Sequence, residues 1–186
     1  MKKDKNMVCP VELAGSLDNK LRKWFQNPQK ILSPYINLGM KVLDVGCGPG
    51  FFSVEIAKMV GEKGKVYSVD LQEGMLDKIR AKIKGTKLER IISTVKCEDG
   101  KINVPEKVDF ILAFYMVHEV PNKDVFFELL KNLLEEKGKF LIVEPKFFHV
   151  TKSEFSLTLE KAKKAGFKTY PGPKLPFSFS AILMNE

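Results

Sequence analysis

A glycine-rich turn is the first part of this sequence whose residue types predict chemistry. Residues 46–50 read Gly-Cys-Gly-Pro-Gly and follow a short apolar strand pattern at 42–45. Gly46 and Gly48 can take positive φ and carry no side-chain bulk, so backbone amides at the start of the next helix can lie directly against a ligand. The turn therefore predicts a site for a cofactor with an anionic group.

A carboxylate at the end of the next expected strand fits the same kind of ligand. Asp70 closes the strand pattern 64–70 and lies 20 residues beyond Gly50. An acid in that place can accept one hydrogen bond from each hydroxyl of a cofactor ribose. Several nucleotide cofactors share this need, so Asp70 alone does not identify the ligand.

A histidine and a second carboxylate follow the fourth expected strand, 108–115. His118 has an unperturbed pKa of about 6.5 and can act as a general base, and the adjacent Glu119 raises that pKa or takes the proton itself. In the alternative interpretation His118 caps the strand and contacts the cofactor without proton transfer. The sequence leaves both open, with His118 and Glu119 as the candidate catalytic residues.

Strand patterns that alternate with helical patterns must position these residues. The alternation predicts an α/β fold with a doubly wound sheet, in which ligands bind beyond the carboxyl ends of the strands. The segment 108–115 is apolar on both faces, as in the interior of a parallel sheet, and Gly138 is expected to end the helix before the next strand. The seven expected strands are 42–45, 64–70, 90–96, 108–115, 139–144, 167–170 and 177–184.

The two ends of the chain add to this mostly parallel sheet. The proline-rich loop 171–176 is short, so the last two strands are expected to form an antiparallel hairpin. Leu13, Leu17 and Leu21 recur at helical spacing, and Asn27-Pro28 predicts the start of another short helix. We therefore expect an N-terminal helical cap or lid over 1–36 and one α/β domain over 37–186.

Composition limits the partners. The chain of 186 residues carries a formal net charge of +8, nearly all of it from lysine, because only three of its 31 basic residues are arginine. Lysines scattered over the whole length predict a solvated surface rather than a phosphate-binding face, which disfavours nucleic acid. The sequence has three cysteines and no Cys-x-x-Cys pair, so we expect neither disulfides nor a metal site, as in a reducing compartment. The longest strongly apolar run, 110–117, is too short to span a bilayer, so we expect no membrane span and a cytoplasmic location.

The glycine turn resembles a known motif. Gly-x-Gly-x-Gly preceded by Asp44 is similar to motif I of the class I S-adenosylmethionine-dependent methyltransferases, of the type 11 or ubiquinone/menaquinone methyltransferase-like kind. The dinucleotide fingerprint instead needs a third glycine at position 51, where this chain has Phe51. The segment 69–76 resembles the family's second motif. The resemblance extends over roughly 41–186 and implies the Rossmann-like form of the sheet.

The resemblance implies S-adenosylmethionine as the cofactor and transfer of its methyl group to an acceptor by in-line displacement, without a metal. One of the two acids at 98 and 99 would meet the adenine amino group, and which one is left open. The sheet carries almost no insertions, and the resemblance implies that the added N-terminal segment caps the cofactor and shapes the acceptor site, which favours a small-molecule acceptor. The oligomeric state is left open. The cofactor-binding residues implied are Asp44, Gly46, Cys47, Gly48, Asp70, Leu71, Met75, Glu98, Asp99 and Phe114.

Two other functions remain open at this point. An NAD-linked oxidoreductase would use a similar turn, although Phe51 and the lack of a substrate domain disfavour it. A cofactor-binding protein without catalysis would carry the same glycine loop.

Overall fold

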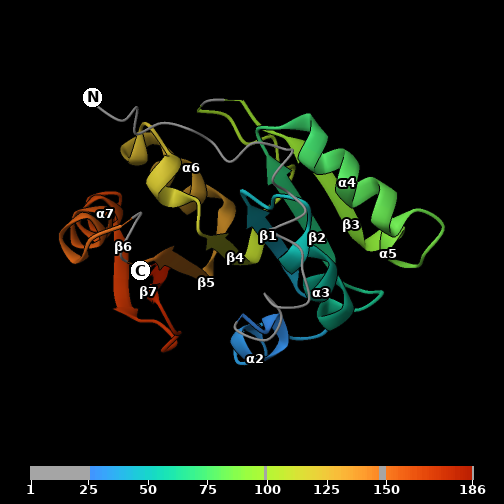
Figure 1. Ribbon diagram of the computed structural model, residues 1–186, viewed down its shortest axis with the longest axis horizontal. Coiled ribbons are helices and arrows are strands. Elements are labelled where there is room, and N and C mark those ends of the chain that lie inside the picture. The colour runs from blue at the N-terminus through green and yellow to red at the C-terminus, as the bar shows by residue number, and fades with distance from the viewer. Residues whose placement is uncertain (1–25, 99, 147–149, 186) are drawn as a thin grey trace.

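The architecture is a seven-stranded sheet with helices on both faces, seen in a computed structural model that describes residues 26–98, 100–146 and 150–185 (Figure 1). The strands are β1 Lys41–Val45, β2 Lys65–Asp70, β3 Ile92–Lys96, β4 Val108–Phe114, β5 Leu134–Pro145, β6 Phe167–Pro171 and β7 Ser178–Asn185. The helices are α2 Pro28–Leu32, α3 Phe51–Val60, α4 Glu73–Ile83, α5 Leu88–Ile91, the 3₁₀ turn η2 Val117–Glu119, α6 Lys123–Leu133 and α7 Lys152–Lys164.

The strand order is β3-β2-β1-β4-β5-β7-β6. The strands β1 to β5 pair in parallel, whereas β7 lies antiparallel between β5 and β6. This confirms the predicted doubly wound fold and the C-terminal hairpin. The order reverses between β1 and β4, which places a crevice at the carboxyl ends of these two strands.

The sheet is buried on both sides, which explains its apolar strands. Val42 and Leu112 pack in the core shared with α3 and α4, while their neighbours Leu43 and Ile111 pack in the core shared with α6 and α7. Figure 1 shows α6 and α7 beside each other, away from α3 and α4. Alternate residues of each central strand therefore face different helix layers.

The predicted helix start at Asn27-Pro28 is confirmed. The Asn27 side chain accepts the Lys30 N–H at 3.1 Å and starts α2. Thr151 and Glu154 form a reciprocal capping box at the start of α7. The predicted helix around Leu13 to Leu21 lies outside the described residues.

The boundary between α6 and β5 differs from the prediction. Gly138 does not end a helix: α6 ends at Leu133, and β5 begins directly afterwards. The pairing of β4 with β5 shifts register, since Val108 pairs with Leu134 but Phe110 pairs with Lys139. A Cβ on Gly138 would come within 2.6 Å of the Leu134 side chain, so the glycine permits close packing within this irregular strand.

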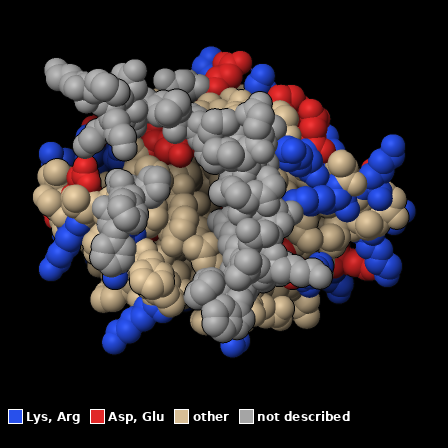
Figure 2. Space-filling view, in the orientation of Figure 1, with Lys and Arg blue, Asp and Glu red and all other residues tan. Residues whose placement is uncertain are grey.

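Within the three described ranges, no helix is both long enough and apolar enough to cross a bilayer. The Lys and Arg side chains on the face shown in Figure 2 stand in several separate places rather than in one patch.

Candidate functional site

A cavity of about 540 Å³ opens at the carboxyl ends of β1 to β4. Its walls come from the segments that follow these strands and from one side of α6. This is where the reversal of strand order places the ligand site of a doubly wound sheet. Four separate parts of the sequence therefore meet at one site.

The glycine loop forms the floor of this cavity. The N–H groups of Gly46 and Cys47 both donate to the Val69 carbonyl, at 2.8 and 3.0 Å, and so hold the loop against β2. Gly46 has a φ of +67°, and a Cβ there would lie 2.7 Å from the Met116 side chain. Gly48 has a φ of +53°, but the space beside it is open, with no atom within 4 Å of an added Cβ. The loop thus offers bare backbone to a ligand.

Asp70 is held by the backbone around it. Its side chain is 8% exposed, and its two oxygens accept the N–H groups of Gly48 and Gln72, each at 2.9 Å. Burial raises the pKa of Asp70, and the N–H groups of Gln72, Gly48 and Leu71 partly offset this rise. Each carboxylate oxygen has a second lone pair, so the residue can still accept hydrogen bonds from a ligand.

Asp44 and the cysteines complete the inner wall. Asp44 is 2% exposed and accepts a 2.5 Å hydrogen bond from Ser53 of α3. Burial raises the pKa of the Cys47 thiol, and the nearby Asp44 and Asp70 raise it further. Burial also raises the pKa of Cys97 to about 11. Both thiols are therefore protonated near neutral pH, and neither supplies a thiolate nucleophile.

Leu71, Met75 and Glu98 line the side of the cavity next to the loops after β2 and β3. The backbone of Glu98 pairs with that of Lys101 in a tight turn. Asp99 lies outside the described residues, so the choice between the two acids stays open. Phe114, at the end of β4, lines the cavity and stacks near Phe52, with ring centroids 4.3 Å apart.

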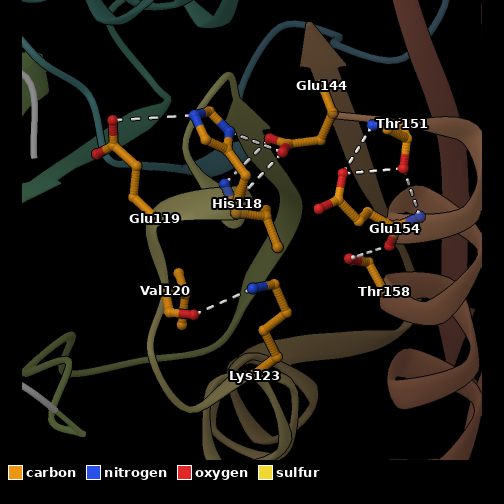
Figure 3. Close-up of polar contacts among 9 residues, drawn as sticks. His118, Glu119, Val120, Lys123, Glu144, Thr151, Glu154 and Thr158 are labelled. Atoms are coloured by element: carbon orange, nitrogen blue, oxygen red, sulfur yellow. Dashed lines mark hydrogen bonds and ion pairs between the residues drawn. The ribbon is translucent and has the colours of Figure 1, made fainter. Parts of the chain in front are cut away.

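The two candidate catalytic residues occupy different positions. Glu119 lines the cavity, whereas His118 is not among the described residues that do so. The His118 Nδ1 lies 2.8 Å from Oε2 of Glu144, and its Nε2 lies 3.9 Å from Oε1 of Glu119 (Figure 3). His118 therefore stands behind Glu119 as seen from the ligand space.

The sequence analysis did not single out Glu144 as a site residue. It is 2% exposed at the end of β5, and it also accepts the backbone N–H groups of Val117 and His118, both at 3.0 Å. The available signal was an acid at the end of an otherwise apolar strand, next to the segment that carries His118.

The pKa of His118 reflects opposing influences. Burial lowers it, but the hydrogen bond with Glu144 and the charges of Glu144 and Glu119 raise it, and the net result is a pKa above its usual value. The charge of Lys123 on α6 acts against this rise.

The remaining wall, beside Glu119, is largely apolar. It was missed because its members lie in the segments that flank η2 and along α6, where sequence patterns show only ordinary core positions. Its apolar residues are Met116, Val120, Val125, Phe126 and Leu129, and Tyr115 lies next to them.

The charge of the cavity is opposite to that of the chain. The described lining residues include four acids, Asp44, Asp70, Glu98 and Glu119, and one basic residue, Lys101. No group of three or more His, Cys, Asp or Glu that could hold a metal ion occurs in the described part of the chain.

Comparison with known proteins finds a matching domain family and similar solved structures. The profile of the methyltransferase domain family matches residues 36–171. A solved S-adenosylmethionine-dependent methyltransferase from Aquifex aeolicus is 30% identical with a TM-score of 0.85, and the match covers 96% of this chain and 100% of that one.

Two further matches show less about this chain, because one has low sequence identity and the other covers only part of each protein. A putative S-adenosylmethionine-dependent methyltransferase from Methanococcus maripaludis has a TM-score of 0.78 at 16% identity, over 100% of this chain and 97% of that one, and shows the fold alone. The ubiquinone/menaquinone biosynthesis C-methyltransferase UbiE of Shewanella sp. (strain ANA-3) is 30% identical over 107 residues, which are 57% of this chain. The match spans only 43% of that relative's length.

Proposed function

Because this chain belongs to the methyltransferase domain family, we propose that it transfers the methyl group of S-adenosylmethionine to a small organic acceptor by in-line displacement. Membership confirms the resemblance to class I S-adenosylmethionine-dependent methyltransferases, the enzyme class and the cofactor. The observation that carries the acceptor proposal is the acidic, partly apolar cavity at the ends of β1 to β4.

The residues present fit this cofactor. S-adenosylmethionine carries ribose hydroxyls, a sulfonium and an amino acid group, and the cavity offers a buried carboxylate at Asp70, a second at Asp44, and open backbone at Gly48. When bound, it supplies an electrophilic methyl group: the bond from acceptor to methyl carbon forms while the carbon–sulfur bond breaks and leaves its electron pair on sulfur. This chain has to hold the two reactants in line, exclude water and remove the acceptor's proton.

Size and charge together favour a small acceptor that is not anionic. A volume of about 540 Å³ is within the usual range for a single small-molecule site, roughly 300–1,000 Å³, so little space remains beside a bound cofactor. Glu119 lies in the apolar wall formed by Met116, Val120 and Phe126. A phosphate or carboxylate on the acceptor would be repelled by that acid, and the same repulsion disfavours a nucleic acid.

Proton removal is assigned to the pair of His118 and Glu119. Glu119 faces the cavity, and the raised pKa of His118 makes its neutral form a stronger base than a free imidazole. No metal ligand set is part of the proposal.

The cap or lid and the cytoplasmic location stay predictions. The cap or lid over 1–36 falls mostly outside the described residues. Its described part includes α2, where Ile31 and Leu32 are buried against the core that α3 shares. The cytoplasmic location rests on the cysteine pattern, with Cys47 and Cys97 present as free thiols.

The test uses the cofactor directly. Calorimetry on the full chain should show binding of S-adenosylmethionine and of its demethylated product, with no binding of NAD or NADP. Incubation with methyl-labelled cofactor and fractionated cell metabolites should then label a small, non-anionic compound. Binding without labelling of any fraction would favour the non-catalytic alternative, and NAD binding alone would favour the oxidoreductase.

A further inference from the structure

Glu144 is a buried acid whose contacts converge on two adjacent residues, Val117 and His118. Its Oε2 lies 3.0 Å from the main-chain N and 2.8 Å from the Nδ1 of His118, and its Oε1 accepts the Val117 N–H at 3.0 Å. Figure 3 shows His118 between Glu144 on β5 and Glu119 on η2. The three side chains lie in a row that begins in the core and ends at the cavity wall.

From this row we propose that Glu144, His118 and Glu119 form a proton relay, in which Glu119 meets the acceptor, His118 stores the proton, and Glu144 is a positioning residue for His118. The relay deepens the proposed methyl transfer and rests on it.

The contacts of Glu144 select one form of the imidazole. An ionised carboxylate can only accept hydrogen bonds, and two of its contacts here are already with backbone donors. The Nδ1 of His118 must therefore carry the hydrogen in the contact with Oε2. In the neutral ring the lone pair is then on Nε2, the nitrogen that faces Glu119.

With the hydrogen on Nδ1, the Nε2 atom of His118 and the Glu119 carboxylate can together accept one proton. The Nε2 lone pair and a Glu119 carboxylate repel each other at 3.9 Å, and one proton placed between them turns the repulsion into attraction. The two groups then titrate as a unit rather than independently. The arrangement follows the same logic as a carboxylate–imidazole pair that activates a nucleophile.

The proton balance is as follows. The acceptor's X–H bond gives its proton to a carboxylate oxygen of Glu119, and Glu119 passes it to Nε2 of His118 once the two side chains close from 3.9 Å to hydrogen-bond distance. The hydrogen on Nδ1 stays in place, so the resulting imidazolium lies between two carboxylates. The proton leaves to solvent when Nε2 deprotonates after product release.

Among the described residues, the charged groups that act on His118 come from three elements. Glu144 on β5 and Glu119 on η2 favour the imidazolium, while Lys123 on α6 opposes it. The Nζ of Lys123 is held by the Val120 carbonyl at 3.1 Å. Glu154, which Figure 3 shows in the same region, is instead engaged in the capping box at Thr151.

The experiment measures the tautomer and the titration midpoint of the His118 imidazole directly, in the full chain without added ligand. Long-range ¹H–¹⁵N spectra of ¹⁵N-histidine protein report which nitrogen carries the hydrogen and the midpoint of titration. The sequence has two histidines, so His118→Gln assigns the signals. We expect neutral His118 to hold its hydrogen on Nδ1, and both Glu144→Gln and Glu119→Gln to lower its titration midpoint.

Glu154→Gln is the matched control, because glutamine also completes a capping box and Glu154 is not among the charges that shift the pKa of His118. It should leave the midpoint unchanged. Hydrogen on Nε2 in the parent protein would overturn the relay, as would a midpoint that moves no more in Glu119→Gln than in Glu154→Gln. Both of these outcomes can be observed even if Glu144→Gln does not fold.

Calorimetry with S-adenosylmethionine on the same samples distinguishes a failure of the relay from a failure of the proposed methyl transfer. Cofactor binding together with an Nε2–H tautomer overturns the relay alone. Failure to bind the cofactor overturns the proposed function, and with it the role of the relay in methyl transfer.

Discussion

The main-chain N–H of Gly48 donates to the Oδ2 of Asp70 at 2.9 Å, so the glycine loop after β1 and the acid after β2 form one hydrogen-bonded unit. The two residues are 22 positions apart in the sequence. A ligand that contacts Asp70 therefore also contacts a residue that fixes the shape of the loop.

Replacing Asp70 with alanine should weaken S-adenosylmethionine binding at least tenfold. Each hydrogen bond to a charged acceptor contributes about 1.5–3 kcal/mol, and about 1.4 kcal/mol corresponds to a factor of ten. Calorimetry gives the dissociation constant. Asp77→Ala, which removes an exposed carboxylate of α4 that pairs with Arg80, is the control and should bind as the parent does. An unchanged constant for Asp70→Ala would mean that Asp70 does not hold the ribose.

Cofactor affinity should fall as the pH is lowered through the pKa of Asp70. Burial raises that pKa above the ordinary 3.8, so the acid takes up a proton at a higher pH than an exposed aspartate. A protonated carboxyl loses part of its ability to accept from the ribose hydroxyls. Dissociation constants measured from neutral pH downward should show the loss, and the part due to Asp70 should be missing in Asp70→Asn. Parallel profiles for the two proteins would argue against this assignment.

Two glycines of the same loop should respond differently to alanine. Both have positive φ, which costs an alanine roughly 1–3 kcal/mol, but only at Gly46 would the new Cβ collide with Met116. Urea unfolding should therefore show a larger loss of stability for Gly46→Ala than for Gly48→Ala. Gly48→Ala should instead weaken cofactor binding more than its loss of stability suggests, because its Cβ would enter the open space beside the loop. Equal unfolding free energies would contradict the packing at Gly46.

His118 should stabilise the fold in a pH-dependent way. Its folded-state pKa is raised above the ordinary 6.5, so its contribution is fully present below the unfolded pKa and is lost as the pH rises through the folded pKa. The difference in unfolding free energy between the parent and His118→Gln should be largest at acid pH and shrink across that window. Denaturant unfolding at a series of pH values measures it. A difference that does not change with pH would show that the imidazolium is not favoured in the fold.

Once an acceptor is known, the cavity-facing acid should matter for rate more than for cofactor affinity. Glu119→Gln removes the carboxylate but keeps the shape, and loss of a general base typically costs 10²–10⁴-fold in rate. The turnover number at saturating cofactor should fall by roughly 100-fold, while the dissociation constant of the cofactor changes little. If the parent rate persists, proton removal does not pass through Glu119.

The sequence by itself determined the features that depend on local pattern. The turn at 46–50, the acid at Asp70 and the capping box at Thr151 are each contained in a few neighbouring residues, because backbone conformation and capping act over short distances. The alternation of strands and helices was equally local, and it was enough to predict the doubly wound sheet and the edge at which the site lies.

Only the tertiary structure decided how residues from different strands face one another. The contact of Glu144 with His118 joins positions 26 apart, and it exists because β4 and β5 run in parallel and end at the same edge of the sheet. The strand pattern gives no side-chain directions beyond a strand end, so it could not show that Glu119 faces the cavity while His118 turns toward the core. The same holds for Gly138, whose role follows from the register shift between β4 and β5 and from the space left beside Leu134.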